Sequence, residues 1–454
     1  KMKNTLIASL VLVIALQVAA ADWPHWRGPH HDGVSVEKNL PTEWAEDKNV
    51  VWKLPIKGSS SATPIVFAGK VFTMAELDKQ VLLIAVDLKG KELWRTPVGT
   101  GKGTGSGERT LASPTPSADS RHIYTMTGNG DVAATKFDGK PAWSFNAQER
   151  YGRFRLGFGF HTTPLLFQGR LYLQLIHSGG AWVVAIDTFT GKEVWKVERK
   201  SDGVAECEHS YASPCAVAVG DTFQIVTHGN DYAIGHDPAN GKELWRVGDL
   251  NHKDRYNRTL RFVASPVAHG DLVVIPTAKN RGVAAISVAN AKGYIGTGGK
   301  GEVWRIDRGT PDVPSPVIYN NLVYLCRENG TVTCLDGKTG EQLYSESPHR
   351  QTYRASPVAG DGKIYITSRD GMVTVLQAGR EFKVLSKNKL AGGLTARIRA
   401  RCHRTLSSGR QTQQYGALCG RSRLVLSHGF LVSYRPLARL SPELPMQIGL
   451  ALRG

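Results

Sequence analysis

Hydrophobic and polar positions alternate over short stretches along most of the chain, and turn residues separate these stretches. The segment from Ala185 to Trp195 shows the unit: a strand that ends at Asp187, a Thr190-Gly191 turn and a second strand that ends at Trp195. Glycine at such a turn supplies the positive φ that a tight hairpin needs. Similar units close at Trp94, Trp143, Trp245, Trp304 and Tyr344. The pattern predicts antiparallel sheets that repeat along the chain.

A second marker, a small residue followed by proline, fixes the period of this repeat. It occurs as Thr63-Pro64, Ser113-Pro114, Thr163-Pro164, Ser213-Pro214, Ser265-Pro266, Ser315-Pro316 and Ser356-Pro357, with spacings of 50, 50, 50, 52, 50 and 41 residues. Each interval has room for four short strands, and four-stranded units repeated in a ring are propeller blades. The sequence therefore predicts an all-β, eight-bladed β-propeller whose eighth blade should begin near residue 398.

The blade ending Ala-x-Asp-x-x-Thr-Gly-Lys-x-x-Trp resembles that of the quinoprotein-like, or PQQ-like repeat, β-propeller family, and the resemblance covers about residues 52–396. It implies that the closing aromatic docks between neighbouring blades. This role falls on Trp52, Trp94, Trp143, Trp195, Trp245, Trp304 and Tyr344. Members similar to this chain include pyrroloquinoline quinone (PQQ) dehydrogenases, the propeller lipoprotein of the outer-membrane assembly complex, and exported proteins without assigned activity.

The two ends of the chain depart from the repeat. Residues 1–21 have the basic start, apolar run and small-residue cleavage site of a secretory signal, which predicts a periplasmic or secreted protein without a membrane span. Residues 22–51 are expected to form a polar arm over the ring. Trp52 should end a lone fourth strand that closes the ring by pairing with the last blade.

The tail from Arg397 to Gly454 contains ten Arg, no Lys, no Asp and one Glu, and it lacks the expected Ser-Pro strand. We interpret it as the product of a frameshift that removed most of the eighth blade; the alternative is a genuine basic tail. This tail carries half of the net charge of +18. The remaining charge does not indicate a nucleic-acid partner, and a monomer is expected.

Metal and cofactor sites find little support in the sequence. His25, His30 and His31 lack an acid or Cys at a recognised ligand spacing. The resemblance to PQQ dehydrogenases implies an adjacent Cys-Cys pair and calcium held by Glu, Asn and Asp, but the chain has no adjacent Cys pair. We therefore expect no metal and no PQQ with calcium. For the cysteines Cys207, Cys215, Cys326 and Cys334 the disulfide state stays open.

Candidate binding residues come from unusually long blade connections. Those after Trp94, Trp143, Trp195 and Trp245 have 19–21 residues, whereas the others have 12 or 13. Loops on a rigid scaffold often carry binding residues. Counting back three or five positions from each marker proline gives Arg109, His161, His209, Tyr211, Arg261 and Arg354. Positions two apart on an extended segment face the same side, so these residues should meet at the funnel mouth.

These groups suit an anionic or carboxylate-bearing ligand, such as an acidic peptide or a sugar acid. An alternative is that they pair with Glu108 and Glu208 and only tie the loops together. The function predicted from the sequence is a non-catalytic module that binds a protein or a small anion. The competing hypotheses are a PQQ-dependent dehydrogenase and a hydrolase that uses the long loops.

Overall fold

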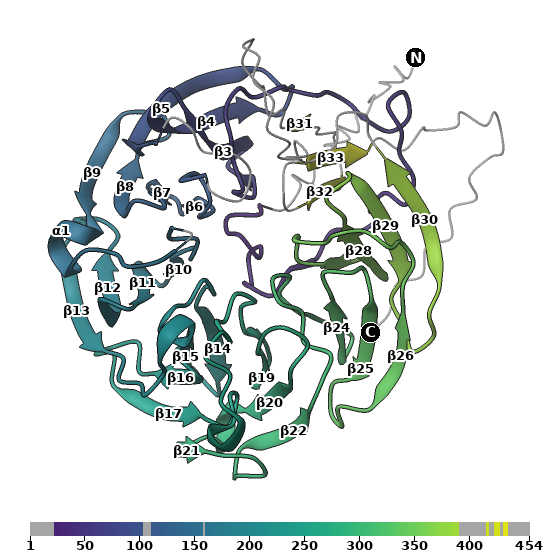
Figure 1. Cartoon of the computed structure of the whole chain (residues 1–454). Coiled ribbons are helices and arrows are strands. Elements are labelled where there is room, and N and C mark those ends of the chain that lie inside the picture. The colour runs from purple at the N-terminus through teal and green to yellow at the C-terminus, as the bar shows by residue number, and fades with distance from the viewer. Residues whose placement is uncertain are drawn as a thin grey trace, which may run out of the picture.

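The computed structural model describes residues 22–102, 110–157 and 159–389, together with three short strands near the C-terminus. Seven four-stranded blades follow one another around a central axis, and the chain passes from blade to blade in sequence order (Figure 1). The innermost strand of each blade comes first in sequence and the outermost comes last. The predicted all-β propeller is confirmed.

The strand bounds follow the repeat. The first three blades contain β2 (Ile65–Phe67), β3 (Lys70–Leu77), β4 (Gln80–Asp87) and β5 (Glu92–Thr100); β6 (Ser117–Ala118), β7 (Ile123–Met126), β8 (Asp131–Thr135) and β9 (Pro141–Asn146); and β10 (Leu165–Phe167), β11 (Arg170–His177), β12 (Gly180–Asp187) and β13 (Glu193–Glu198). The fourth and fifth contain β14 (Cys215–Val219), β15 (Thr222–Gly229), β16 (Tyr232–His236) and β17 (Glu243–Val247), then β18 (Val267–His269), β19 (Leu272–Pro276), β20 (Val283–Ser287) and β22 (Glu302–Ile306). The last two contain β23 (Val317–Tyr319), β24 (Leu322–Cys326), β25 (Val332–Asp336) and β26 (Gln342–Glu346), then β27 (Val358–Gly360), β28 (Lys363–Thr367), β29 (Met372–Gln377) and β30 (Val384–Lys389).

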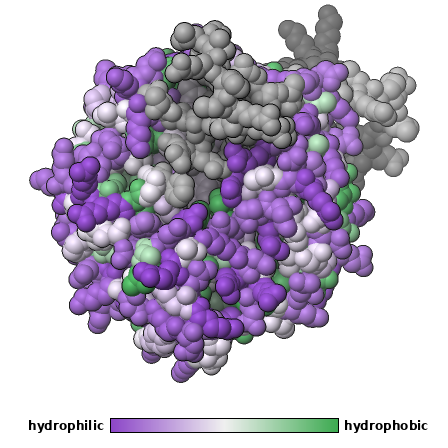
Figure 2. Space-filling view, in the orientation of Figure 1, coloured by the Kyte–Doolittle hydropathy of each residue, from purple (hydrophilic) through white to green (hydrophobic). Residues whose placement is uncertain are grey.

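The middle strands are buried on both faces because neighbouring blades cover them. In β12 the run Val183–Ile186 is fully buried, whereas the outer strand β13 has only exposed and partly buried residues. This explains why hydrophobic residues run continuously in the middle strands and alternate only at the rim. Figure 2 shows the result on one face, where hydrophilic residues dominate the surface of the blades.

The closing aromatics connect one blade to the hairpin turn of the next. The indole Nε1–H donates to a turn carbonyl in five cases: Trp52 to Leu88 at 3.0 Å, Trp94 to Phe137 at 3.1 Å, Trp143 to Thr188 at 2.9 Å, Trp195 to Pro238 at 3.0 Å and Trp304 to Gly337 at 2.9 Å. The turn glycine lies on the indole: a Cβ on Gly191, whose φ is +69°, would stand 2.7 Å from Trp143. Tyr344 packs against Phe382 with ring centroids 5.5 Å apart.

Trp245 packs between the fourth and fifth blades as predicted but differs from the other closing tryptophans in its hydrogen bond. Its indole is fully buried and donates to Gln224 Oε1 of its own blade at 2.6 Å. The connection between β20 and β22 contains η4 (Val288–Asn290) and an additional strand, β21 (Gly293–Ile295), which pairs in parallel with β17 and places Gly293 opposite Trp245. Val288 and Ala291 of this connection and Ile295 of the extra strand share one hydrophobic cluster with Trp245.

The marker hydroxyls form a chain of hydrogen bonds around the axis. In six of the seven blades the backbone N–H of the marker residue donates to the hydroxyl of the next blade at 2.9–3.0 Å. The links run Thr63 to Thr115, Thr115 to Thr163, Thr163 to Ser213, Ser213 to Ser265, Ser265 to Ser315 and Ser315 to Ser356. The marker of the second blade is therefore Thr115-Pro116, and our assignment of Ser113-Pro114 was two residues out of register.

The N-terminal arm crosses the axis and is partly buried, in contrast to the expected polar arm over the ring. Trp23 pairs with Val66 of the first blade, and β1 (Val34–Ser35) pairs in parallel with β27 of the seventh. Between them Arg27 is buried and donates to the carbonyl oxygens of Asp32 at 2.8 Å, Pro316 at 2.5 Å and Pro357 at 3.4 Å. Burial lowers the pKa of Arg27 to about 10, and the nearby Asp32 opposes this shift.

The arm also closes the seam between the first and seventh blades. Leu40 and Trp44 join one hydrophobic cluster with residues of both blades, and Trp44 N–H donates to Asn388 Oδ1 at 3.0 Å. The expectation that Trp52 ends a ring-closing strand was wrong, because residues 50–55 form no strand. Trp52 nevertheless lies on the turn of the first blade, as described above.

The described residues form no eighth four-stranded blade. The strands β31 (Tyr415–Gly416), β32 (Ser422–Leu426) and β33 (Phe430–Tyr434) make a three-stranded sheet, drawn in Figure 1 in the sector between β3 and β28. The rest of the tail and the signal segment 1–21 lie outside the described residues, so the frameshift and the signal stay predictions. Within the described part of the chain, no helix is long and apolar enough to cross a membrane.

Candidate functional site

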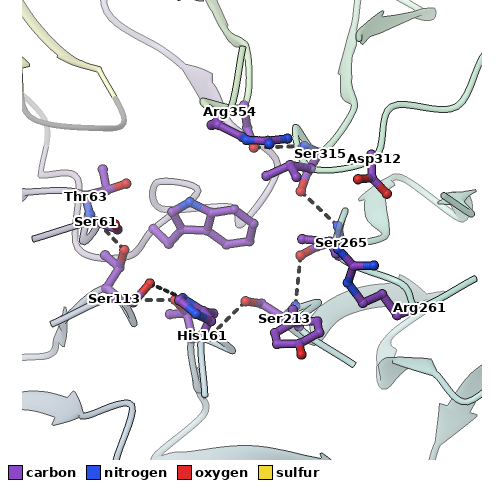
Figure 3. A pocket seen from close by; sticks show the side chains of 17 residues that line it. Ser61, Thr63, Ser113, His161, Ser213, Arg261, Ser265, Asp312, Ser315 and Arg354 are labelled. Carbon is purple, nitrogen blue, oxygen red and sulfur yellow. Dashed lines mark hydrogen bonds between the residues drawn. The ribbon is translucent and has the colours of Figure 1, made fainter. Parts of the chain in front are cut away.

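A cavity of about 240 Å³ lies on the axis of the propeller. The blade lead-ins form its wall and Trp26 of the arm lines it as well (Figure 3). Trp26 also lines a second, much smaller cavity of about 20 Å³ beside His25, Arg27 and His31. The arm therefore divides the channel, and the larger compartment is the candidate site.

The repeat explains how seven blades contribute to one cavity. Each marker proline follows a short extended lead-in, in which the first and third residues before proline face the axis and the second faces the core. Ala62, Ala212, Ala264 and Ala355 occupy the second position and are buried. All seven residues at the third position line the cavity: Ser61, Ser113, His161, Tyr211, Val263, Val313 and Arg354.

His161 and Tyr211 form one side of the site. His161 Nδ1 and Ser113 Oγ are hydrogen-bonded at 2.5 Å, and the His161 and Tyr211 rings lie 5.9 Å apart. In Figure 3, Arg354 and His161 lie on opposite sides of the view, with the indole of the cavity's one tryptophan, Trp26, drawn between them. A ligand against this indole would have an imidazole toward one side and a guanidinium group toward the other.

Arg261 and Asp312 complete the charged lining. Arg261 Nη1 contacts Glu206 Oε2 at 2.9 Å, so the loop-tying ion pair exists, with Glu206 in place of the predicted Glu208. Glu328 fixes the backbone at Asp312. Its carboxylate accepts hydrogen bonds from the backbone N–H groups of Asp312 at 2.5 Å and Val313 at 2.7 Å. Burial raises the pKa of Glu328.

One predicted residue, His209, is described but is not at the cavity, and a second, Arg109, cannot be placed. His209 is not in its wall; its Nε2 lies 2.9 Å from Ser178 Oγ, and burial lowers its pKa. Arg109 lies outside the described residues. With Pro116 as the marker proline of the second blade, the fifth position before it is Leu111, which is buried. Arg109 is therefore not equivalent in the repeat to His209 and Arg261. The other four predicted residues, His161, Tyr211, Arg261 and Arg354, line one cavity, and their binding role stays a prediction.

In three of the four long connections the extra residues include a short helical turn. These are α1 (Ala147–Tyr151), η2 (Ala205–Glu208) and η3 (Lys253–Arg255), which follow Trp143, Trp195 and Trp245. The turn η2 carries Glu206, the partner of Arg261. These three connections thus position residues beside the axial cavity, although most of their charged side chains are not part of its wall.

Residues for a metal or a calcium-bound quinone do not come together here. Among the cavity residues Asp312 is the one carboxylate, and the described chain has no group of three or more His, Cys, Asp or Glu placed to hold a metal ion. His25 and His31 stack at 4.3 Å, and burial lowers the pKa of His31 to about 4. Cys207, Cys215, Cys326 and Cys334 are separate buried thiols. This donor set does not fit PQQ with calcium.

The blade repeat and the axial cavity place this chain among the PQQ-like β-propellers. A family model described as outer membrane protein assembly factor BamB matches residues 78–297 and 292–381. The chain belongs to this family.

Solved structures share the fold at low sequence identity. BamB from Moraxella catarrhalis is 13% identical, with a TM-score of 0.52 over 76% of this chain and 92% of that one. The quinohemoprotein alcohol dehydrogenase from Comamonas testosteroni is 12% identical, with a TM-score of 0.60 over 82% and 73%. A europium-containing methanol dehydrogenase is also 12% identical, with a TM-score of 0.60 over 83% and 87%. The comparison with curated proteins found no match.

Proposed function

We propose that this protein is an exported binding propeller whose axial cavity takes a small carboxylate-bearing ligand. The convergence of His161, Arg261 and Arg354 on one hydroxyl-lined cavity supports this function. Guanidinium groups present paired N–H donors that match the geometry of a carboxylate, and their charge is retained at all physiological pH values. The role is one of binding without catalysis, in the periplasm or outside the cell.

The competing explanation is that the charged residues only hold the loops together. The Arg261–Glu206 contact fits that explanation, since Arg261 bridges the lead-in of the fifth blade to η2. Arg354 and His161, in contrast, belong to lead-ins of the seventh and third blades and face the same cavity from opposite sides. Binding and stability measurements on the same variants separate the two explanations.

The test compares acids with their neutral counterparts by calorimetric titration. We expect galacturonate to bind at least about tenfold more tightly than galactose, a difference of about 1.4 kcal/mol. The double variant Arg261→Gln/Arg354→Gln should lose this preference and keep its fold, as monitored by circular dichroism.

The matched control is Arg121→Gln, which removes an exposed arginine that lies over Phe189, away from the cavity wall. It should bind galacturonate like the parent protein. Unchanged galacturonate binding by the double variant, or a lowered melting temperature as its sole effect, would support loop tying and overturn the proposed function.

A further inference from the structure

Three features of the cavity wall distinguish between carboxylate ligands: an indole, a ring of hydroxyl groups and a carboxylate. We propose that the ligand is a sugar acid, either free or as the terminal residue of an acidic polysaccharide. This inference rests on the proposed carboxylate-binding function and names its ligand class.

The indole of Trp26 offers a stacking surface at the axis. Trp26 is partly buried and lines both compartments of the channel, with the Arg27 guanidinium carbon 5.7 Å from its ring centroid. An indole face favours flat or ring-shaped groups whose C–H bonds carry partial positive charge, because the face of an aromatic ring is electron-rich. A pyranose ring has such a face, whereas the flexible side chain of glutamate does not.

The marker hydroxyls add directional donors around the axis. Thr115, Thr163, Ser213, Ser265 and Ser315 each accept a backbone N–H from the preceding blade and also line the cavity. A hydroxyl has one proton to donate beside its two acceptor lone pairs. Each of these groups can therefore donate to a ligand oxygen while its inter-blade bond stays intact. A ligand rich in oxygen atoms can accept hydrogen bonds from several of these hydroxyl groups at once.

Asp312 favours a ligand that carries hydroxyl donors as well as a carboxylate. Its Oδ1 is buried and has no hydrogen-bond partner among the residues that the structure describes. A buried carboxylate oxygen without a donor is unfavourable, and a sugar hydroxyl can supply that donor. A ligand with several carboxylates would instead place like charges beside Asp312.

The size of the cavity limits the ligand. At about 240 Å³ it lies below the roughly 300–1,000 Å³ typical of pockets for drug-sized molecules. One sugar ring suits this volume better than an extended acidic peptide.

The experiment compares galacturonate, galactose and triglutamate on the full chain by calorimetric titration. We expect galacturonate to bind at least about tenfold more tightly than either alternative. Trp26→Leu should weaken galacturonate binding about tenfold or more, and the matched control Trp26→Phe should stay within about threefold of the parent. Asp312→Ala should weaken galacturonate binding, because it removes the acceptor for a sugar hydroxyl, without weakening triglutamate, for which it removes a like charge.

The outcomes separate this inference from the function on which it rests. Tight triglutamate binding without galacturonate binding would overturn the sugar acid and leave a carboxylate site. Equal binding of galactose and galacturonate would overturn the carboxylate site itself, and absence of binding by both acids would overturn both. If Trp26→Leu does not fold, Asp312→Ala and the comparison of galacturonate with triglutamate on the parent protein still test the sugar acid.

Discussion

Trp195→Ala is expected to lower the free energy of unfolding by about 3–5 kcal/mol, the usual range for removing a large aromatic side chain from a packed site. The indole of Trp195 packs beside Tyr172 at 5.8 Å, donates to the carbonyl of Pro238 and lies against Gly241 of the next blade. Its loss would leave a cavity at the junction of the third and fourth blades. Urea unfolding followed by circular dichroism measures the effect.

Trp195→Phe is the matched control for this substitution. It keeps a ring between the blades and removes the Nε1–H donor, so the expected loss is about 1 kcal/mol, the typical net value of one hydrogen bond. Equal urea midpoints for Trp195→Ala and the parent protein would contradict the docking role.

Acidification from pH 7 to pH 4 should destabilise the propeller by on the order of 5–10 kcal/mol. Burial lowers the pKa of His228 to about 3 and the pKa values of His177 and His236 to about 4, from an ordinary value of 6.5. In this range the unfolded chain binds more protons than the folded chain. The stabilisation is therefore complete above pH 6.5 and is lost progressively as the pH falls toward 4.

The hydrogen bonds of His228 explain why it stays neutral. Its Nε2 lies 2.7 Å from the carbonyl oxygen of Pro276, which can only accept, so this nitrogen carries the proton. Its Nδ1 is buried without a partner among the described residues, and its ring stacks on Phe262 at 4.5 Å. A second proton on His228 would thus lie on a buried nitrogen near the positive charge of Arg199.

Urea titrations at pH 7, 6, 5 and 4.5 measure the pH effect. His228→Phe should flatten the pH dependence, although it also lowers stability at pH 7 because the Pro276 carbonyl loses its donor. The control His269→Gln changes an exposed histidine and should leave the curve unaltered. Identical urea midpoints at pH 7 and pH 4.5 would show that the buried histidines do not act in this way.

The repeat made most of the ring predictable, because the Ser-Pro marker and the closing tryptophan each perform one inter-blade task. Ser213 and Trp195 illustrate this: one accepts the N–H of Thr163, and the other docks on the turn after Asp237. The repeat left the second blade ambiguous, because two positions there satisfy the same rule. Both Ser113-Pro114 and Thr115-Pro116 match the marker, and only the hydrogen bonds of Thr115 identify the second as equivalent to the other blades.

Only those residues of the candidate site that belong to the blade repeat could be predicted from the sequence. His161, Tyr211 and Arg354 share the third position before proline, so periodicity alone brings them together. Trp26 belongs to a segment without a repeat, and its neighbour Arg27 bonds to Pro316 and Pro357 about 300 residues away in sequence. No local pattern reports such contacts. The sequence did contain a signal for the whole cavity wall, namely the residue three positions before each marker proline. This rule also identifies Ser61, Val263 and Val313 as lining residues.

The most direct test of the carboxylate site is a crystal structure of the full chain with galacturonate at saturating concentration. We predict density for one sugar ring in the axial cavity against Trp26, with its carboxylate in contact with Arg354. Density for the sugar elsewhere on the molecule, with the axial cavity empty of ligand, would contradict the proposed function.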